Sequence, residues 1–407
     1  MLLRLLMLVF FLSSFSGFAS DDTQFSAFGT IGLVTSDSSR YGYRNDVSYH
    51  KGVYSGDIDF LNHSLLGVQL DKSLSSDVDF VGQAVIRDLA DPKFERYITL
   101  GFLRYAPSAN WQLRIGRTAP DIFLITEYRD VGVAYIWATP PNEVYGMIPF
   151  RSLDGADVAY STHLGDGTLR AKVFTGQAES VISSAYSVIP IELKNIFGLS
   201  INFSTIDWSI QAQHTQVKLA NEAEDNQQII DAVAQMPPFI WPDAKQFSES
   251  LALKGKHASY TSISGQAYLG NFLLTAELAQ ITSNDTDVIP KLLSGYGSLA
   301  YQLGEHTLYS VYAFTDSDSY TFDEPGVKTQ LIPELISGVE SMNNFYASSQ
   351  QTISIGWRWD FSDNISSSLQ WNNTHIDDLG GALWLNDSAD LSADTINVLM
   401  LSVSFSL

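Results

Sequence analysis

Apolar and polar residues alternate in short runs along most of the chain from Gln24 onward, which is the period-two pattern of β-strands. Clear runs begin at Trp111, Leu169 and Ile353, and the clearest of all ends the chain. In this last run, apolar residues and serines occupy opposite parities: Leu399, Leu401, Val403, Phe405 and Leu407 against Ser402, Ser404 and Ser406. Each strand is therefore expected to have one apolar and one polar face.

The runs come in pairs that are joined by turns of a few residues, while long polar loops separate one pair from the next. Gly270-Asn271 and Gly304-Glu305 mark two of these turns, and Asp166-Gly167 marks a third, since Asp-Gly supplies the positive φ of tight hairpins. Counted in this way, the chain has roughly sixteen strands of about ten residues. Short turns that alternate with long loops are typical of closed, antiparallel transmembrane β-barrels.

Two of the long loops, 219–255 and 316–349, carry apolar residues at helical spacing. They predict short amphipathic helices near 229–236 and 331–339. Aromatic residues at predicted strand ends fit the girdle that barrels place at membrane interfaces: Trp111, Trp208, Trp359 and Tyr105.

One connection, residues 118–152, has no clean period and follows a strand that carries Arg114 and Arg117. A loop of this length inside a β-protein is usually functional or disordered. Disorder is disfavoured here by a set of large apolar groups: Phe123, Tyr128, Tyr135, Trp137, Tyr145 and Phe150. We expect this loop to fold inward against the barrel wall.

The first residues predict export. Residues 1–19 contain one basic residue, Arg4, then an apolar run and small residues at cleavage spacing, as in a secretory signal peptide. A transmembrane anchor is the alternative, but the apolar run is short for one. Residues 20–407 are then expected to form a single barrel domain.

The amino-acid composition further restricts the class of protein. The chain has no cysteine, 12% aromatic residues and a mean hydropathy of +0.01, which suits strands with one apolar and one polar face. The formal net charge of −22 excludes a nucleic-acid partner, whose phosphates require a basic face. A soluble β-sandwich or β-solenoid is also compatible with composition, but the strand lengths and the alternation of connections favour a barrel.

The chain resembles Gram-negative outer-membrane porins. The resemblance covers the mature chain in layout and rests on the first strand (25–32), the inward loop between the fifth and sixth strands, and the final strand. Residues 141–146 are similar to the Pro-Glu-aromatic-Gly tip of the porin loop, whereas the last residue is Leu407 where such porins usually end in phenylalanine. The resemblance implies a multi-pass barrel in the cell outer membrane, in contact with lipid and lipopolysaccharide and assembled as a homotrimer.

The charged residues of the wall and of the loop would control passage through such a barrel. The candidate constriction residues are Arg87, Arg114, Arg117, Asp121, Glu127, Asp130, Glu143, Arg170, Lys172 and Arg358. Opposed charges across an aqueous gap would create a transverse field that orients polar solutes. Alternatively, the same charges form salt bridges that fix the loop to the wall. No cofactor and no metal site are expected.

The predicted function is passive diffusion of small hydrophilic solutes and ions, filtered by size and charge at the loop. The alternative is a non-conducting barrel used for adhesion or surface binding through its long loops. An enzyme is not expected, although His257 and Ser259 have the His-x-Ser spacing of a barrel phospholipase. The acidic pairs Asp285/Asp287 and Asp316/Asp318 are expected to be solvated loop tips rather than divalent-cation sites.

Overall fold

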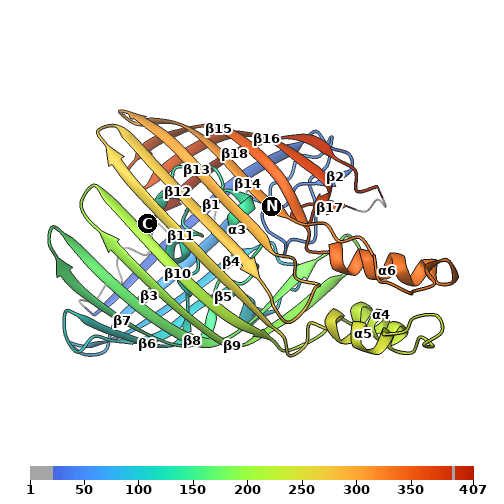
Figure 1. Cartoon of the computed structure of the whole chain (residues 1–407). Coiled ribbons are helices and arrows are strands. Elements are labelled where there is room, and N and C mark those ends of the chain that lie inside the picture. Colours follow the sequence, from blue (N-terminus) through green and yellow to red (C-terminus); the bar gives the residue numbers. More distant parts are fainter. Residues whose placement is uncertain (1–21, 387–389) are drawn as a thin grey trace.

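The computed structural model describes residues 22–386 and 390–407, so the predicted signal peptide lies outside the described residues. Sixteen strands pair antiparallel in a closed barrel, as the alternating pattern predicts (Figure 1). The barrel closes where β1 pairs with β18, and Ala27 exchanges two backbone hydrogen bonds with Leu407. Among the described residues, no helix is long and apolar enough to cross a membrane.

The barrel strands follow chain order around the wall. They are β1 (Thr23–Ser36), β3 (Leu65–Ser73), β4 (Val78–Arg87), β5 (Ile98–Tyr105), β6 (Trp111–Thr118), β7 (Leu153–Leu164), β8 (Gly167–Ser183), β9 (Val188–Ser204), β10 (Trp208–Leu219), β11 (His257–Leu269), β12 (Phe272–Thr282), β13 (Leu292–Leu303), β14 (His306–Ser317), β15 (Ser348–Ser362), β16 (Ile365–Gly381) and β18 (Asp394–Ser406). The short strands β2 (Tyr41–Gly42) and β17 (Leu385–Asn386) pair with each other.

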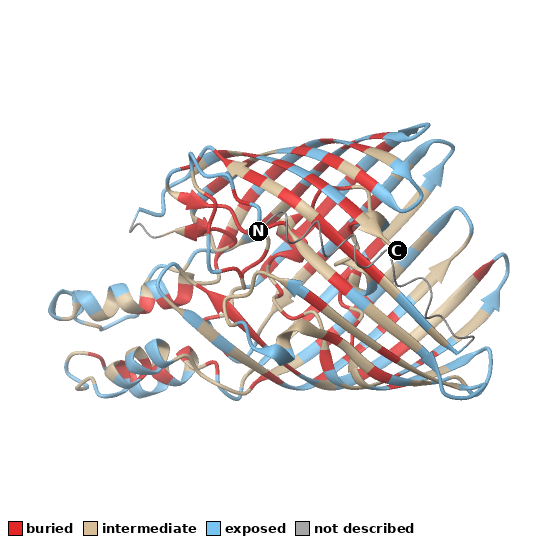
Figure 2. Cartoon of the chain, turned by 180° about the vertical axis from the view of Figure 1, so that it is seen from behind, coloured by how far each residue is buried: buried red, intermediate tan, exposed pale blue. Residues whose placement is uncertain are grey.

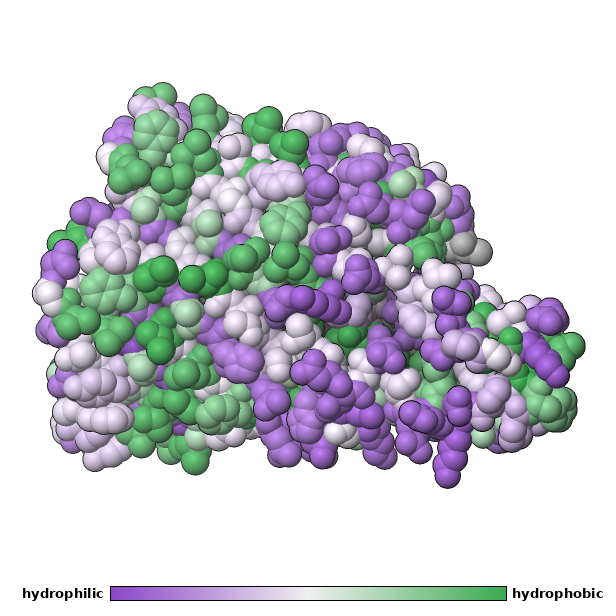
Figure 3. Space-filling model, viewed as in Figure 1, coloured by the Kyte–Doolittle hydropathy of each residue, from purple (hydrophilic) through white to green (hydrophobic). Residues whose placement is uncertain are grey.

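Burial alternates from residue to residue along many wall strands (Figure 2), as expected when successive side chains point to opposite faces. On β18, Leu399, Leu401 and Val403 are exposed on the outside, whereas Ser402 and Ser404 are buried within the barrel. The outward-facing apolar residues gather over the part of the wall nearest the short turns (Figure 3). An exterior of this kind suits contact with lipid hydrocarbon, because its backbone groups are paired and its side chains are apolar.

The barrel has two unlike ends, which we call the turn end and the loop end. The helices of the long loops lie at the loop end and project beyond the wall (Figure 1). They are α4 (Glu224–Ala234), α5 (Ala244–Leu251) and α6 (Pro333–Asn344). Helices α4 and α6 confirm the two predicted helices, while α5 was not predicted. Trp241 packs against Phe247 and Phe322 with ring centroids 5.0 and 5.2 Å apart, so these loops have an aromatic core of their own.

The loop after β6 lies inside the barrel, as predicted. It contains the short helices η1 (Thr126–Tyr128), η2 (Gly132–Ala134) and α3 (Asn142–Tyr145). The ring of Phe123 lies 4.9 Å from that of Tyr145 and 5.6 Å from that of Tyr260 on β11. Burying each ring contributes about 2 kcal/mol, so the aromatic residues hold the loop against the inner wall.

Candidate functional site

The tip of the inward loop is attached to the wall formed by β12, β13 and β15. The Tyr145 hydroxyl donates to Glu277 Oε2 at 2.7 Å, and the indole N–H of Trp137 donates to Ser298 Oγ at 3.0 Å. Glu143 is 2% exposed and accepts a hydrogen bond of 2.7 Å from Gln350. These polar contacts are buried, and a space of only about 20 Å³ remains beside Glu143 and Gln350 on this side of the loop.

Arg358 on β15 provides a second attachment. Its guanidinium donates to the backbone carbonyls of Gly132, Val133 and Tyr135, all within the inward loop. It also pairs with Asp360, at 2.7 Å. The hydrogen-bonding capacity of Arg358 is used by the loop, so this residue anchors the loop rather than facing it across water.

Five charged residues form what we call the arginine cluster: Arg87 on β4, Asp46 in the loop after β1, and Arg129, Asp130 and Arg151 in the inward loop. Arg151 lies 2.9 Å from Asp46 and also pairs with Asp130, whose carboxylate lies 3.5 Å from Arg87. Burial alone would raise the pKa of Asp130, but the neighbouring guanidinium groups, led by that of Arg151, hold this pKa below its usual value. The cluster is therefore ionised at neutral pH, with three cations and two anions.

A second group, the lysine cluster, lies between the loop and the strands β6–β8. Lys172 pairs with Asp121 at 2.6 Å, and Arg114 pairs with Asp157 at 2.9 Å. Glu127 joins the two pairs, at 3.5 Å from Arg114 and 3.7 Å from Lys172. The side chain of Glu127 is 52% exposed, whereas that of Lys172 is fully buried. Glu127 is thus the acid of this cluster that presents a carboxylate to water.

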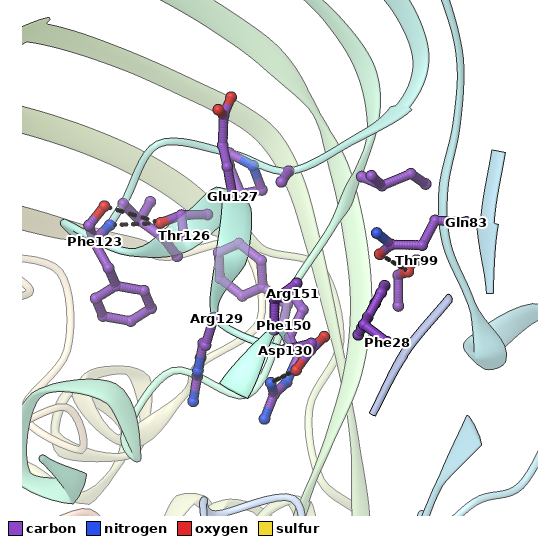
Figure 4. Close-up of a pocket in the computed structure, with 15 residues that line it drawn as sticks. Phe28, Gln83, Thr99, Phe123, Thr126, Glu127, Arg129, Asp130, Phe150 and Arg151 are labelled. Carbon is purple, nitrogen blue, oxygen red and sulfur yellow. Dashed lines mark hydrogen bonds and ion pairs between the residues drawn. The ribbon is translucent and has the colours of Figure 1, made fainter. Parts of the chain in front are cut away.

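A narrow recess separates the loop from the opposite wall (Figure 4). Glu127, Arg129 and Arg151 line its loop side, while Gln83 and Thr99 line its wall side. The wall side is neutral, and the Thr99 hydroxyl donates to Gln83 Oε1 at 2.6 Å. The recess has a volume of about 30 Å³. A water molecule needs a cavity volume of roughly 10–15 Å³, so the recess holds only about two waters.

Wider cavities lie on both sides of this level. The loop-end cavity has a volume of about 290 Å³, shares Thr99 and Arg151 with the recess, and is lined by basic and acidic residues in nearly equal number. Two adjoining cavities of about 250 Å³ each lie at the turn end and share Tyr128, Gln266 and Tyr268 in their linings. Of these spaces, the largest thus lie toward the two ends of the barrel and the recess beside the inward loop is much smaller.

The structure brings most of the predicted constriction residues together, but not all of them. Arg87 and Asp130 meet in the arginine cluster, and Arg114, Asp121, Glu127 and Lys172 meet in the lysine cluster. Arg117 instead pairs with Asp154 at 2.7 Å beside the loop-end cavity. Arg170 contacts neither cluster, and its buried Nε has no hydrogen-bond partner in the described part of the chain. Glu143 and Arg358 belong to the attachments described above.

Sequence analysis missed four members of the two clusters: Asp46, Arg129, Arg151 and Asp157. Arg129 is adjacent to the predicted Asp130, and Arg151 ends the same loop, so both could have been found by pairing every acid in the loop with a base. Asp157 faces inward on β7 in register with Arg114 on β6, which is visible once the strand pairing is known. Nothing in the sequence indicates that Asp46, about eighty residues earlier, reaches this site.

The His-x-Ser pair lies outside the barrel, at the loop end of β11. His257 Nδ1 is 2.8 Å from Asp285 Oδ2, a partner that the sequence did not indicate. Among the described residues, Ser259 makes no hydrogen bond to His257, so the contact between nucleophile and base is not formed. No group of three or more His, Cys, Asp or Glu side chains in the described ranges is placed to hold a metal ion.

No protein-family model matches the chain, and no curated protein matches it. Solved structures do match. The outer membrane channel DcaP of Acinetobacter baumannii is 12% identical, with 96% of this chain and 99% of that chain covered and a TM-score of 0.56. OmpT of Vibrio cholerae is 11% identical over 96% of this chain and 99% of its own, with a TM-score of 0.52. The anion-selective porin of Comamonas acidovorans is 11% identical over 95% and 100%, with a TM-score of 0.52. At this identity the comparisons confirm the fold, a porin-like closed barrel.

Proposed function

We propose that the mature chain, residues 20–407, is an outer-membrane channel through which ions and small hydrophilic solutes diffuse passively. The observation that carries this proposal is Glu127, a half-exposed acid that lines the recess beside the inward loop of a closed barrel with an apolar exterior. The pair of Asp121 with Lys172 already joins the loop to the wall and Asp157 already pairs with Arg114, so the half-exposed Glu127 adds a carboxylate that faces water. In a channel, it places charge where every passing solute must meet it.

The filter acts by size first. Between the inward loop and the neutral side chains of Gln83 and Thr99, the recess admits a file of water or a partly hydrated ion. Larger solutes require the loop to move away from this wall. The attachments to Glu277, Arg358 and Gln350 lie on the opposite side of the loop and hold its tip, whereas on the recess side Asp130 pairs with Arg87 of β4 at 3.5 Å.

Charge sets the second filter. The arginine cluster has one surplus cation and the lysine cluster one surplus anion, so the two nearly cancel, and Glu127 is the most exposed of their charges. An acidic chain with an exposed carboxylate at its constriction concentrates cations there. We therefore expect a mild preference for cations, with anions still admitted beside Arg129 and Arg151.

Planar-bilayer recording tests this proposal. A purified wild-type barrel in a gradient of KCl should conduct and give a reversal potential with a mild cation preference. Glu127→Gln should shift the reversal potential toward anions, because it removes the exposed carboxylate and leaves Arg114 and Lys172. Glu324→Gln, an equal change in an exposed outer loop, is the matched control and should leave the reversal potential unchanged.

A folded barrel that passes no current would overturn the channel and favour the second candidate, a binding protein. That alternative rests on the helices α4, α5 and α6, which project from the loop end with an aromatic core of their own (Figure 1). Binding of intact cells or matrix proteins by the wild type, lost when these loops are shortened, would support it.

Orientation and assembly complete the proposal. Outer-membrane barrels place short turns in the periplasm, so a tag inserted at Gly304 should escape labelling on intact cells while one in 318–332 is labelled.

The resemblance to porins further implies a homotrimer in contact with lipopolysaccharide. Chemical cross-linking in outer-membrane vesicles tests the trimer, and a monomer as the largest species would exclude it.

A further inference from the structure

The two turn-end cavities differ in chemistry from the rest of the inner space. The loop-end cavity and the recess are lined by many charged residues, whereas Arg358 and Asp360 are the only charged residues known to line either turn-end cavity within the described chain. Those two pair with each other, and Arg358 is already bonded to the loop. A solute in these cavities therefore meets a wall without free charge.

Aromatic rings and amides replace the charges. Tyr128 and Tyr135 come from the inward loop, and Tyr268 faces them from the turn end of β11, where it is 50% exposed. Gln266 lies one alternation along the same strand and Gln302 lies on β13. Rings from the loop and from the wall thus border one space, with amides between them.

Most of these polar groups are not used by the protein itself, although the amide of Gln302 donates to the carbonyl of Gly304 at 3.4 Å. In the described part of the chain, neither the hydroxyls of Tyr128 and Tyr268 nor the side-chain amide of Gln266 makes a hydrogen bond, whereas the hydroxyl of Tyr135 is buried near Asp130 and Arg151. Burial raises the pKa of Tyr128 to about 12, so its hydroxyl stays protonated and can donate. Neutral donors and acceptors that face a cavity and lack partners are available to a bound molecule.

We propose that the turn-end cavities form a binding subsite for a neutral, polyhydroxylated solute of the sugar class. The inference rests on the proposed channel function and names its solute. A sugar ring has apolar C–H faces, which can stack on tyrosine rings, and hydroxyls around its edge, which pair with amides and phenols. A charged solute would lose hydration here without gaining a counter-charge, and a wholly apolar solute would leave the amides unpaired.

Block of the ion current tests the subsite without requiring that the sugar pass the recess. Maltotriose is added to the turn-end side of a bilayer that contains the wild-type channel, and the KCl current is followed as its concentration rises. We expect concentration-dependent, saturable block. A polyethylene glycol of similar hydrodynamic size should block at least tenfold less strongly, because it offers no array of hydroxyls.

Three variants at the subsite and one control variant test whether the block occurs at these residues. Tyr268→Leu removes the ring and the hydroxyl and should raise the apparent dissociation constant of maltotriose about tenfold or more. Tyr268→Phe keeps the ring and should cost only about fivefold. Tyr301→Leu makes the same change on the outer face of β13 and should leave the block unchanged. Gln266→Met, which keeps length but removes the amide, should weaken the block in the same range as Tyr268→Phe.

The outcomes separate the subsite from the channel. A normal KCl current without saturable block by maltotriose, or a block that Tyr268→Leu leaves intact, overturns the subsite and leaves the channel standing. If the folded barrel passes no current, the channel fails, and equilibrium dialysis of labelled maltotriose against the detergent-solubilised barrel decides the subsite. Binding that Tyr268→Leu abolishes supports it there, and absence of binding overturns it.

Discussion

Single side chains distinguish the two faces of the barrel wall. Leu401 is 46% exposed on the outside of β18, between Leu33 on β1 and Leu369 on β16. Leu401→Arg should destabilise the barrel by about 2–4 kcal/mol if the residue lies near the bilayer midplane, because a guanidinium would replace an apolar group in hydrocarbon. Gln112→Arg, on the inner face of β6, is the control and should be far milder. Urea unfolding from lipid vesicles measures both, and equal losses would show that the faces are misassigned.

The sequence does not show which acids of the inward loop face water and which are buried against the wall. Glu127 and Glu143 have the same side chain and lie in the same loop, yet one is half exposed and the other is 2% exposed beside Gln350. The sequence predicted both as constriction residues, because charge and loop membership are visible in it. Which acid becomes buried depends on contacts with strands two hundred residues away, and those contacts follow only from the closed topology.

At the scale of the element, the inward loop is fixed by ion pairs that depend on pH. Burial works against Asp121 and Asp130, but Lys172 and Arg151 respectively outweigh it and hold both pKa values below the usual value. A carboxyl whose pKa is lower in the folded state stabilises that state above its unfolded pKa of about 3.9, and the stabilisation is lost as the pH falls through the folded value. The loop should therefore stay attached from neutral pH down to about pH 5 and loosen below about pH 4.

Hydrogen exchange of the loop, measured at several pH values, tests this expectation. Protection of residues 119–131 should fall in acid in the wild type. In the double variant Asp121→Asn, Asp130→Asn, protection should be low already at pH 7 and should change little with pH. Asp207→Asn, in an exposed turn, should behave like the wild type. Protection in the wild type that persists unchanged below pH 3 would mean that packing rather than ion pairs fixes this part of the loop.

The sequence predicts strands correctly where apolar and polar residues alternate regularly. It predicts strand limits wrongly where contacts between distant parts of the chain determine them. The sequence pattern predicts a strand over residues 58–70, but β3 begins only at Leu65, because residues 37–64 fold over the loop end instead. There Arg44 donates to the carbonyls of Ser183 and Leu383, contacts that no local pattern encodes. The pattern likewise predicts strands over 168–176 and 193–203 with a long loop between them, but β8 and β9 continue pairing past a register shift at Gly176 and Ala178 and meet in a short turn. The alternating pattern thus predicts strands well but does not predict how far a hairpin extends beyond the membrane.

At the scale of the whole molecule, a closed wall and one inward loop together determine what can pass. The wall alone encloses a space wide enough to hold a loop of more than thirty residues, and the loop reduces the free space beside Gln83 to about 30 Å³. The closed wall and the inward loop both follow from the sequence pattern. The size of the space that remains between them does not, because it depends on how completely the aromatic and ionic contacts of the loop fill the barrel.

Replacing residues 128–142 with a short Gly-Ser linker should therefore raise the single-channel conductance several-fold, since it removes η2, Trp137 and the contacts with Arg358 while every wall strand is kept. The cation preference should change as well, because Arg129 and Asp130 leave and Glu127 loses its neighbours. An equal replacement of residues 318–332, in an outer loop, controls for loop shortening and should change neither property. Heat-modifiable mobility on gels shows whether each variant is a folded barrel, and conductance and reversal potential in KCl are then compared. If the folded inner-loop variant conducts and selects like the wild type, the loop does not limit the current, and the constriction must be sought in the helices at the loop end.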